Sequence, residues 1–293
     1  MKPEILVIGA LGNVGTEVVK SLIAKGINVR AADLFPEKVR QRFGEGVEAV
    51  LFDFARPETF VPAFTGIRRL FLMRPPQIAD VQKYMLPALE AAKSAGAKQM
   101  VFLSLIGIEK NKVVPHYKVE QWLKASGLDY TFLRCSFFMQ NLNTTHRAEI
   151  RDRDEIYVPV GSAKTSFLDV RDIGAVAALV LTQPGHEKKA YDLTGSEALD
   201  YDEVAALFSQ VLGRRITYKN PSPLAFFIRQ VQQKSPLMFA LVTTWLYNNT
   251  RRGMADTVTG EVERLLGRKP ILMRQYIEDY KESWLHSARS SNL

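Results

Sequence analysis

The stretch ILVIGALGNVG, residues 5–15, constrains the fold of this chain more than any other feature. An apolar run leads directly into three glycines spaced three residues apart, Gly9, Gly12 and Gly15, and apolar residues at helical spacing follow. Glycines in such a loop permit a tight turn, a close approach of backbone N–H groups to a pyrophosphate, and close packing of the helix on the sheet. The pattern therefore predicts a dinucleotide-binding loop, with a ligand-free glycine turn as the alternative.

Short apolar runs alternate with helical patterns throughout the first half of the chain. Strands are expected at 5–8, 27–32, 47–52, 67–73, 98–104 and 130–133, and glycines end the intervening helices. This alternation is typical of a doubly wound parallel sheet, whose strands are apolar because both faces are covered. The sequence predicts an α/β fold with a Rossmann domain over residues 1–155.

The second half is mixed. A short strand followed by a helix is expected over 165–181 and another strand over 190–195, so that 165–195 returns to the first domain's sheet. Residues 196–293 are expected to form a smaller, mainly helical substrate or lid domain. Its expected helices cover 200–213, 255–266 and 273–285, with one or two more in the aromatic and aliphatic segment 222–252.

Composition limits the classes of partner. The 293 residues carry a net charge of +8, but the basic residues occur as scattered pairs, so no nucleic-acid partner is expected. The single cysteine, Cys135, and the lack of an apolar run of about 18 residues predict a cytoplasmic protein without a membrane partner. The four histidines, of which His286 is the last, lie far apart, and no metal site is expected. A monomer or a homodimer is expected.

Two acidic residues follow predicted strands. Asp33 ends the second strand, 18 residues after Gly15, where a carboxylate accepts hydrogen bonds from a ribose hydroxyl and repels a 2′-phosphate. Leu34 comes next, not a basic residue, so NAD(H) is favoured over NADP(H). Asp53, followed by Phe54, ends the third strand and is expected to contact the adenine, or else to cap a turn. The loop residues assigned to the nucleotide are Gly9, Leu11, Gly12, Asn13, Val14 and Gly15.

The chain resembles the NmrA-like family of atypical short-chain dehydrogenases and reductases, a group that includes type-2 quinone reductases. The resemblance rests on segments spread over about residues 5–270, namely VIGALGNVG, VFLSLIGIE, PHYKVEQWLKASGLDYTFLRCSFFMQN, FLDVRDIGAVA, YDLTGSEALDYDEVA and VERLLGRKP. It implies a Rossmann domain, a smaller C-terminal domain, and a nicotinamide nucleotide bound in the cleft between them.

The chain departs from ordinary short-chain dehydrogenases in one catalytic feature. Those enzymes use a Tyr-x-x-x-Lys pair on one helix face, in which the lysine lowers the pKa of the tyrosine. None of the ten tyrosines here has a lysine four residues later. The remaining catalytic candidates are Ser104 at the end of the fifth strand, His116 as a proton donor, and Lys118 as a ligand of the nicotinamide ribose. The alternatives are a histidine paired with Glu120 and an ordinary surface lysine.

Further binding residues are expected from the loops that follow the strands. Met73 and Arg74 are expected beside the cofactor, although Arg74 also fits an exposed loop arginine. Phe137 and Phe138 are expected to form a wall of the nicotinamide pocket, and Met139 and Asn141 to contact the substrate, with core packing as the alternative for all four.

Two functions fit these observations. The first is a reductase that moves hydride from NADH to a small apolar quinone, enone or related conjugated carbonyl, under an apolar lid that includes Phe226, Met238 and Trp245. Such acceptors need little acid catalysis, which is compatible with the missing tyrosine. The second is a non-catalytic, NmrA-type redox sensor in which segment 222–247 is a docking surface. A nucleotide-dependent isomerase or epimerase is a further alternative, disfavoured by the lack of Tyr-x-x-x-Lys.

Overall fold

The computed structural model describes residues 2–285. The described chain divides into two compact units, each assembled from separate stretches of sequence. Unit 1 comprises 2–135, 170–193 and 261–268, and unit 2 comprises 136–169, 194–260 and 269–285. The glycine loop and Asp33 therefore belong to unit 1, whereas the apolar segment 222–252 belongs to unit 2.

Unit 1 is built on a seven-stranded sheet in the order β3-β2-β1-β4-β5-β6-β8. All neighbouring strands are parallel. The strands are β1 (Ile5–Ile8), β2 (Val29–Asp33), β3 (Glu48–Leu51), β4 (Arg69–Leu72), β5 (Gln99–Leu105), β6 (Asp129–Cys135) and β8 (Lys189–Leu193). The central strands are almost entirely buried, and the α/β fold expected from the sequence is confirmed.

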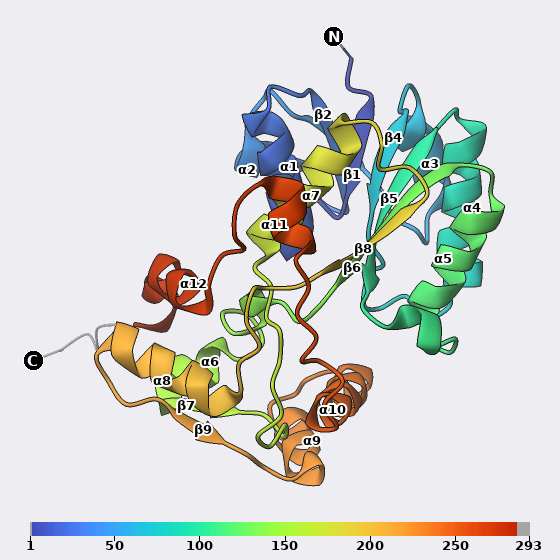
Figure 1. The fold of residues 1–293 in the computed structure, drawn as a ribbon. Helices are drawn as coiled ribbons and strands as arrows, with labels where there is room; N and C mark the ends of the chain where they lie inside the picture. Colours follow the sequence, from blue (N-terminus) through green and yellow to red (C-terminus); the bar gives the residue numbers. More distant parts are fainter. Residues whose placement is uncertain (1, 286–293) are drawn as a thin grey trace, which may run out of the picture. The chain divides into compact units, whose positions relative to one another are not determined.

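Helices cover both faces of this sheet (Figure 1). One face carries α1 (Asn13–Ala24), α2 (Pro36–Phe43), α7 (Val170–Thr182) and α11 (Glu261–Leu266); the other carries α3 (Phe60–Phe64), α4 (Val81–Ser94) and α5 (Pro115–Ala125). Short 3-10 turns lie at η1 (Pro57–Thr59) and η2 (Ile108–Lys110). Helices α1 and α7 pack so closely that a Cβ on Gly174 would lie 2.7 Å from the Glu17 carbonyl oxygen, and the glycine permits this approach.

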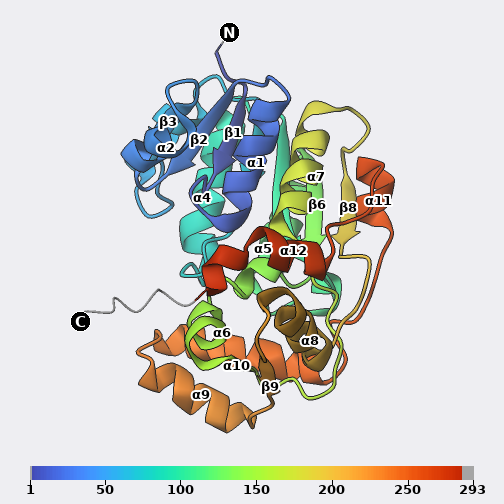
Figure 2. The ribbon, with the colours of Figure 1, turned by 90° about the vertical axis from the view of Figure 1, so that its left-hand side faces the viewer.

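Unit 2 has its own core. Its two short strands, β7 (Glu155–Tyr157) and β9 (Thr217–Lys219), pair in parallel. Its helices are α6 (Arg147–Arg153), α8 (Tyr201–Leu212), α9 (Pro223–Gln232), α10 (Leu237–Arg251) and α12 (Met273–Asp279), with 3-10 turns η3 (Met139–Asn141) and η4 (Lys281–Trp284). Figure 2 shows α9 and α10 in orange. The core is centred on the buried side chains of Phe208, Tyr276 and Trp284.

Several local predictions are confirmed, and others differ from the structure. Helix α8 begins at a capping box, in which Asp200 and Glu203 bond each other's backbone N–H groups, and it ends at Gly213. The strand expected at the start of 165–181 is reduced to two isolated bridges. The helix expected over 255–266 covers only α11, because 255–260 forms loop.

Candidate functional site

The glycine loop connects β1 to α1 and has the geometry of a phosphate cradle. Gly9 has a φ of +75°, a left-handed conformation that favours glycine. A Cβ on Gly15 would lie 2.0 Å from the Gly9 carbonyl oxygen, so only glycine permits this close approach of helix and loop. Gly12 is the N-cap of α1 and supplies no side chain to the first-turn N–H groups. These donors and the helix dipole therefore remain for an anionic ligand.

Asp33 lies at the carboxyl end of β2 and binds the glycine loop. Its Oδ2 accepts a 3.0 Å hydrogen bond from the backbone N–H of Leu11, and its Oδ1 accepts a 2.8 Å bond from that of Leu34. Both bonds orient the carboxylate, while its remaining lone pairs are available to ribose hydroxyls. The structure thus places Asp33 beside the loop, as the sequence suggested.

Arg42 is a neighbour of the loop that sequence reasoning missed. Its Nη1 donates to Thr16 Oγ1 at 3.0 Å and approaches the Leu11 carbonyl oxygen at 3.4 Å. Arg42 lies in the last turn of α2, on the solvent side. The only sequence signal was a basic cluster in the helix after Asp33, which is also typical of an ordinary solvated helix. Asp33 and Arg42 thus place opposite charges beside the same loop.

Met73 and Arg74 follow β4. The Met73 Sδ would lie 2.6 Å from a Cβ on Gly9, so this side chain covers the glycine loop. Arg74 is half-buried, and its Nη1 donates to the carbonyl oxygens of Pro75, Pro76 and Ile78. Burial lowers the pKa of Arg74. Its guanidinium therefore holds its own loop in place, while Nε has no partner among the described residues.

Ser104, Glu120 and Arg134 form a buried network at the carboxyl ends of β5 and β6. Ser104 Oγ donates a 2.7 Å bond to Glu120 Oε1, and Arg134 binds the same carboxylate through Nε at 3.1 Å and Nη2 at 2.8 Å. Arg134 also pairs with the exposed Glu109 at 3.2 Å. The pKa of Arg134 is raised by the hydrogen bonds that it donates to Glu120 and by the charges of its acidic neighbours. Sequence reasoning missed Arg134, because only the pairing of two strands brings it to Glu120.

His116 and Lys118 lie on different faces of α5, as the helical spacing predicts. His116 and Glu120 share the buried face, whereas Lys118 is exposed. Glu120 is bound to Ser104 and Arg134, and Nδ1 of His116 has no partner among residues 2–285. Burial and the nearby Arg74 charge lower the pKa of His116 to about 3. His116 is therefore a neutral imidazole at pH 7.

Asp53 and Phe54 follow β3. The Asp53 Oδ1 accepts a 2.8 Å hydrogen bond from the Ala55 N–H, so this carboxylate does cap a turn. It remains half-exposed at the sheet edge. Phe54 is buried and packs edge-on against Phe52 at 4.8 Å between ring centroids.

The other candidate residues belong to unit 2. Phe137 stacks on Tyr247 with 6.2 Å between ring centroids, Phe138 is half-buried, and Met139 is buried. Phe226 lies in the core of the unit, with its ring 5.4 Å from that of Tyr247.

Asn141 is half-buried, at the end of η3, while Met238 and Trp245 are exposed on α10. Tyr247 also meets a buried histidine, since its hydroxyl lies 2.6 Å from Nε2 of His146.

Two classes of feature are absent from the described chain. Over residues 2–285, no group of three or more His, Cys, Asp or Glu side chains is placed to hold a metal ion. His286 lies outside the described residues. No helix in that same range is long and apolar enough to cross a membrane.

The chain is similar to known proteins of one family. Residues 1–266 match the model of the NmrA-like family. The NAD(P)H azoreductase of Xenophilus azovorans is 37% identical over 221 residues, covering 73% of this chain and 76% of the azoreductase. Quinone oxidoreductase 2 of Escherichia coli is 26% identical over 227 residues, covering 76% of this chain and 79% of its own length.

Solved structures share the fold. The NADPH-dependent quinone oxidoreductase of Escherichia coli, complexed with NADPH, superimposes with a TM-score of 0.85 at 23% identity, covering 94% of this chain and 99% of the other. The Citrobacter triphenylmethane reductase, complexed with NADP(H), gives a TM-score of 0.81 at 24% identity, covering 93% and 98%. The resemblance seen in the sequence is confirmed: the chain belongs to the NmrA-like family.

Proposed function

We propose that this protein is an NAD(P)H-dependent reductase that transfers hydride to a small apolar quinone, enone or related conjugated carbonyl. The observation that carries the proposal is the cradle of Gly9, Gly12 and Gly15 at the N-terminus of α1, with Asp33 bound to it. Two relatives, an azoreductase and a quinone oxidoreductase, support an electron-accepting conjugated substrate.

The residues present fit a nicotinamide dinucleotide. The space that a Cβ on Gly15 would fill is needed for the close approach of α1, and the uncapped first turn offers N–H donors to a pyrophosphate. When bound, the reduced nucleotide supplies the hydride. We assign Gly9, Leu11, Gly12, Asn13, Val14 and Gly15 to the pyrophosphate, Asp33 and Leu34 to the adenosine ribose, and Asp53 and Phe54 to the adenine.

The nucleotide preference depends on two opposed charges. Asp33 accepts from ribose hydroxyls and repels a 2′-phosphate, which favours NADH. Arg42 places a guanidinium beside the same loop, and a guanidinium is a good partner for a phosphate. The two structural relatives described above contain NADP(H) or NADPH. We therefore propose that NADH is favoured by Asp33 and that Arg42 allows NADPH to bind as well.

Reduction needs one hydride and one proton, and no Tyr-x-x-x-Lys pair is present to supply the proton. As a neutral imidazole, His116 acts as a hydrogen-bond donor that polarises the acceptor oxygen, and does not act as an imidazolium acid. The final proton then comes from water. Lys118 is assigned to the nicotinamide ribose. Ser104 is assigned to positioning, because its hydroxyl proton is directed at Glu120.

The remaining assignments concern the two residues after β4 and the candidate residues of unit 2. Met73 lies against the glycine loop and the charge of Arg74 acts on His116, and both residues are assigned to the cofactor. Phe137 and Phe138 are assigned to the nicotinamide pocket, and Met139, Asn141 and Phe226 to the substrate, whereas Met238 and Trp245, which are exposed on α10, are not assigned to the substrate. Of the residues assigned to the substrate, Phe226 and Met139 are buried in the core of unit 2. They would therefore shape the substrate-binding surface through the residues that pack on them.

The experiment is a titration with NADH and NADPH, followed by turnover with a naphthoquinone, an enone and an azo dye. Acceptor-dependent oxidation of the nucleotide is expected, with a deuterium label on the dihydronicotinamide appearing in the reduced enone. Nucleotide binding without oxidation by any acceptor would instead favour the redox sensor. That second candidate is supported by the missing Tyr-x-x-x-Lys pair. Failure to bind either nucleotide would overturn both functions.

A further inference from the structure

Helices α9 and α10 of unit 2 expose an unusual amount of apolar side chain. Leu224 is 67% exposed and Met238 65% exposed, and Trp245 leaves 47% of its surface uncovered. The full set of exposed large apolar residues on the two helices is Leu224, Ile228, Val231, Leu237, Met238, Phe239, Leu241, Val242 and Trp245. We call this set the α9–α10 apolar face. Contiguous exposed apolar patches on soluble proteins mark interaction sites.

These side chains are not needed for the core of unit 2. Each helix already contributes a separate buried face, with Phe226 and Gln230 from α9 and Ala240 and Tyr247 from α10. On α9 the outward residues Leu224, Phe227, Ile228 and Val231 follow at helical spacing. Both helices are thus apolar on the inward and on the outward side, which is typical of helices covered on both sides.

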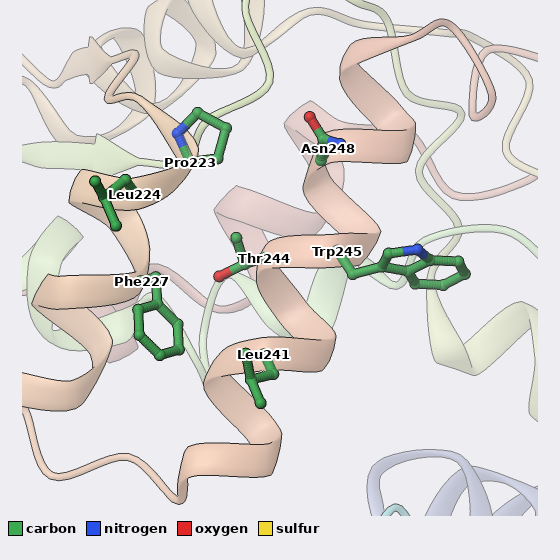
Figure 3. A pocket seen from close by; sticks show the side chains of 7 residues that line it. All are labelled: Pro223, Leu224, Phe227, Leu241, Thr244, Trp245 and Asn248. Carbon is green, nitrogen blue, oxygen red and sulfur yellow. The ribbon is translucent and has the colours of Figure 1, made fainter.

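The apolar face is hollowed between the two helices. A groove of about 360 Å³ is lined by Pro223, Leu224, Phe227, Leu241, Thr244, Trp245 and Asn248 (Figure 3). In Figure 3 the Trp245 ring extends sideways from α10. Tryptophan is enriched where one side of a structure meets hydrocarbon and the other meets water.

The segment that carries this face is basic. Residues 204–255 contain no Asp or Glu, but they contain seven basic residues, Arg214, Arg215, Lys219, Arg229, Lys234, Arg251 and Arg252. Arg214 and Arg229 are paired with Asp154 and Glu155 from elsewhere in unit 2.

Four of the other bases flank the helix pair. Lys234 is exposed in the turn between α9 and α10, while Lys219, Arg251 and Arg252 are exposed near the opposite ends of the two helices. None of the four forms an ion pair with any residue between 2 and 285. The apolar face is therefore bordered by four basic side chains without ion-pair partners among the described residues.

We propose that the α9–α10 apolar face docks on the surface of an anionic lipid bilayer. An amphipathic surface inserts its apolar side chains at the boundary between headgroups and acyl chains, and flanking Lys and Arg residues bind the anionic headgroups. A second copy of this chain fits the face poorly, because a symmetric contact would bring the unpaired basic residues of the two copies together. Peripheral docking needs no spanning helix, although no membrane partner was expected from the sequence.

The test is flotation of the whole protein with phosphatidylcholine vesicles, with and without phosphatidylglycerol. Binding only to vesicles that contain phosphatidylglycerol is expected, and it should decrease as salt increases. The emission of Trp245 should shift to the blue, and Trp245→Phe should lose that shift while Trp122 and Trp284 remain. Arg251→Gln combined with Arg252→Gln should weaken binding by about tenfold or more.

Apolar variants provide a matched comparison. Leu224→Asp combined with Val242→Asp should abolish flotation, whereas Val61→Asp and Val113→Asp, which change exposed valines of unit 1, should leave it intact. An unchanged thermal midpoint in each variant shows that the fold is retained. The proposal is overturned by equal binding to neutral vesicles or by no binding to either type. A concentration-dependent dimer that Val242→Asp dissociates would assign the face to self-association and would also overturn it.

Discussion

The backbone N–H of Leu11 donates a 3.0 Å hydrogen bond to the carboxylate of Asp33. Leu11 belongs to the glycine loop and Asp33 ends β2, so this bond ties the loop to the neighbouring strand. A second bond from the Leu34 N–H fixes the other carboxylate oxygen. One side chain therefore shapes the loop, and we propose that the same side chain carries the charge that discriminates between ribose and ribose phosphate.

Asp33→Asn should shift nucleotide preference toward NADPH. The amide oxygen retains one acceptor for a backbone N–H, while the negative charge that repels a 2′-phosphate is removed. We expect the ratio of the NADPH and NADH dissociation constants to change by about tenfold, measured by calorimetry. Asp53→Asn, which removes the carboxylate after β3, should change both constants equally. An unaltered ratio in Asp33→Asn would remove Asp33 from the selection of nucleotide.

Arg42→Gln should have the opposite effect. The guanidinium lies beside Leu11 and Thr16 and is exposed, so its loss should weaken NADPH binding about tenfold and leave NADH binding within about twofold. Arg40→Gln, also exposed on α2, serves as the control. Equal losses for both nucleotides would show that Arg42 acts on the loop and not on the 2′-phosphate.

Gly15→Ala should weaken nucleotide binding. The new Cβ would lie 2.0 Å from the Gly9 carbonyl oxygen, and backbone atoms cannot move aside without opening the cradle. A loss of about 1–3 kcal/mol in the free energy of unfolding is expected, together with a dissociation constant raised at least about tenfold. Gly46→Ala meets nothing within 4 Å and should change neither quantity. Full nucleotide affinity in Gly15→Ala would contradict the cradle.

Glu120→Ala should destabilise unit 1 far more than Glu109→Ala. Both carboxylates bind Arg134, but the Glu120 side chain is 1% exposed and that of Glu109 is 48% exposed. Removing the buried partner leaves Ser104 without its acceptor and Arg134 with only the exposed Glu109 as an ion-pair partner, which costs up to about 3 kcal/mol, whereas the exposed pair contributes below about 1 kcal/mol. Urea unfolding of the two variants measures this difference. Equal losses would mean that solvent reaches the Glu120 carboxylate.

His116→Gln should flatten the dependence of stability on acid. The folded pKa of His116 is lowered to about 3 from its ordinary value of 6.5, so the unfolded chain takes up a proton that the folded chain does not. The free energy of unfolding is therefore not reduced by this group above about pH 6.5. Below that pH it falls as the pH decreases, by about 2 kcal/mol at pH 5. Unfolding at pH 7 and pH 5 measures the slope. Tyr117→Phe, a change on the same helix that retains the imidazole, should keep the wild-type slope.

Most of the alternation of strand and helix in unit 1 could be predicted, because its strands are apolar runs and α1, α4, α5 and α7 are long enough to show their period. Strands β7 and β9 could not, since each covers only three residues. The expected strand near Thr165 forms only isolated bridges because its partners, Phe138 and Leu199, lie in loops.

The candidate site residues also divide into those that a local sequence pattern reveals and those that it does not. The glycine loop, Asp33 and the shared face of His116 and Glu120 are local patterns and could be read from spacing. The Glu120–Arg134 pair depends on the lateral register of β5 and β6, and Arg42 on how α2 folds back toward the loop. Neither relationship leaves a periodic signal in the chain.

The position of β8 has a consequence for synthesis of the chain. β6 is complete at Cys135, but its lateral partner β8 begins only at Lys189, after residues 136–169 have been committed to unit 2. The nascent sheet must therefore emerge from the ribosome with an unpaired, apolar edge, and with α1 lacking the helix that packs on it. Its protection until residue 193 appears depends on the rate of elongation and on chaperones, which makes the interval between Cys135 and Leu193 the stage at which this protein is most exposed to aggregation.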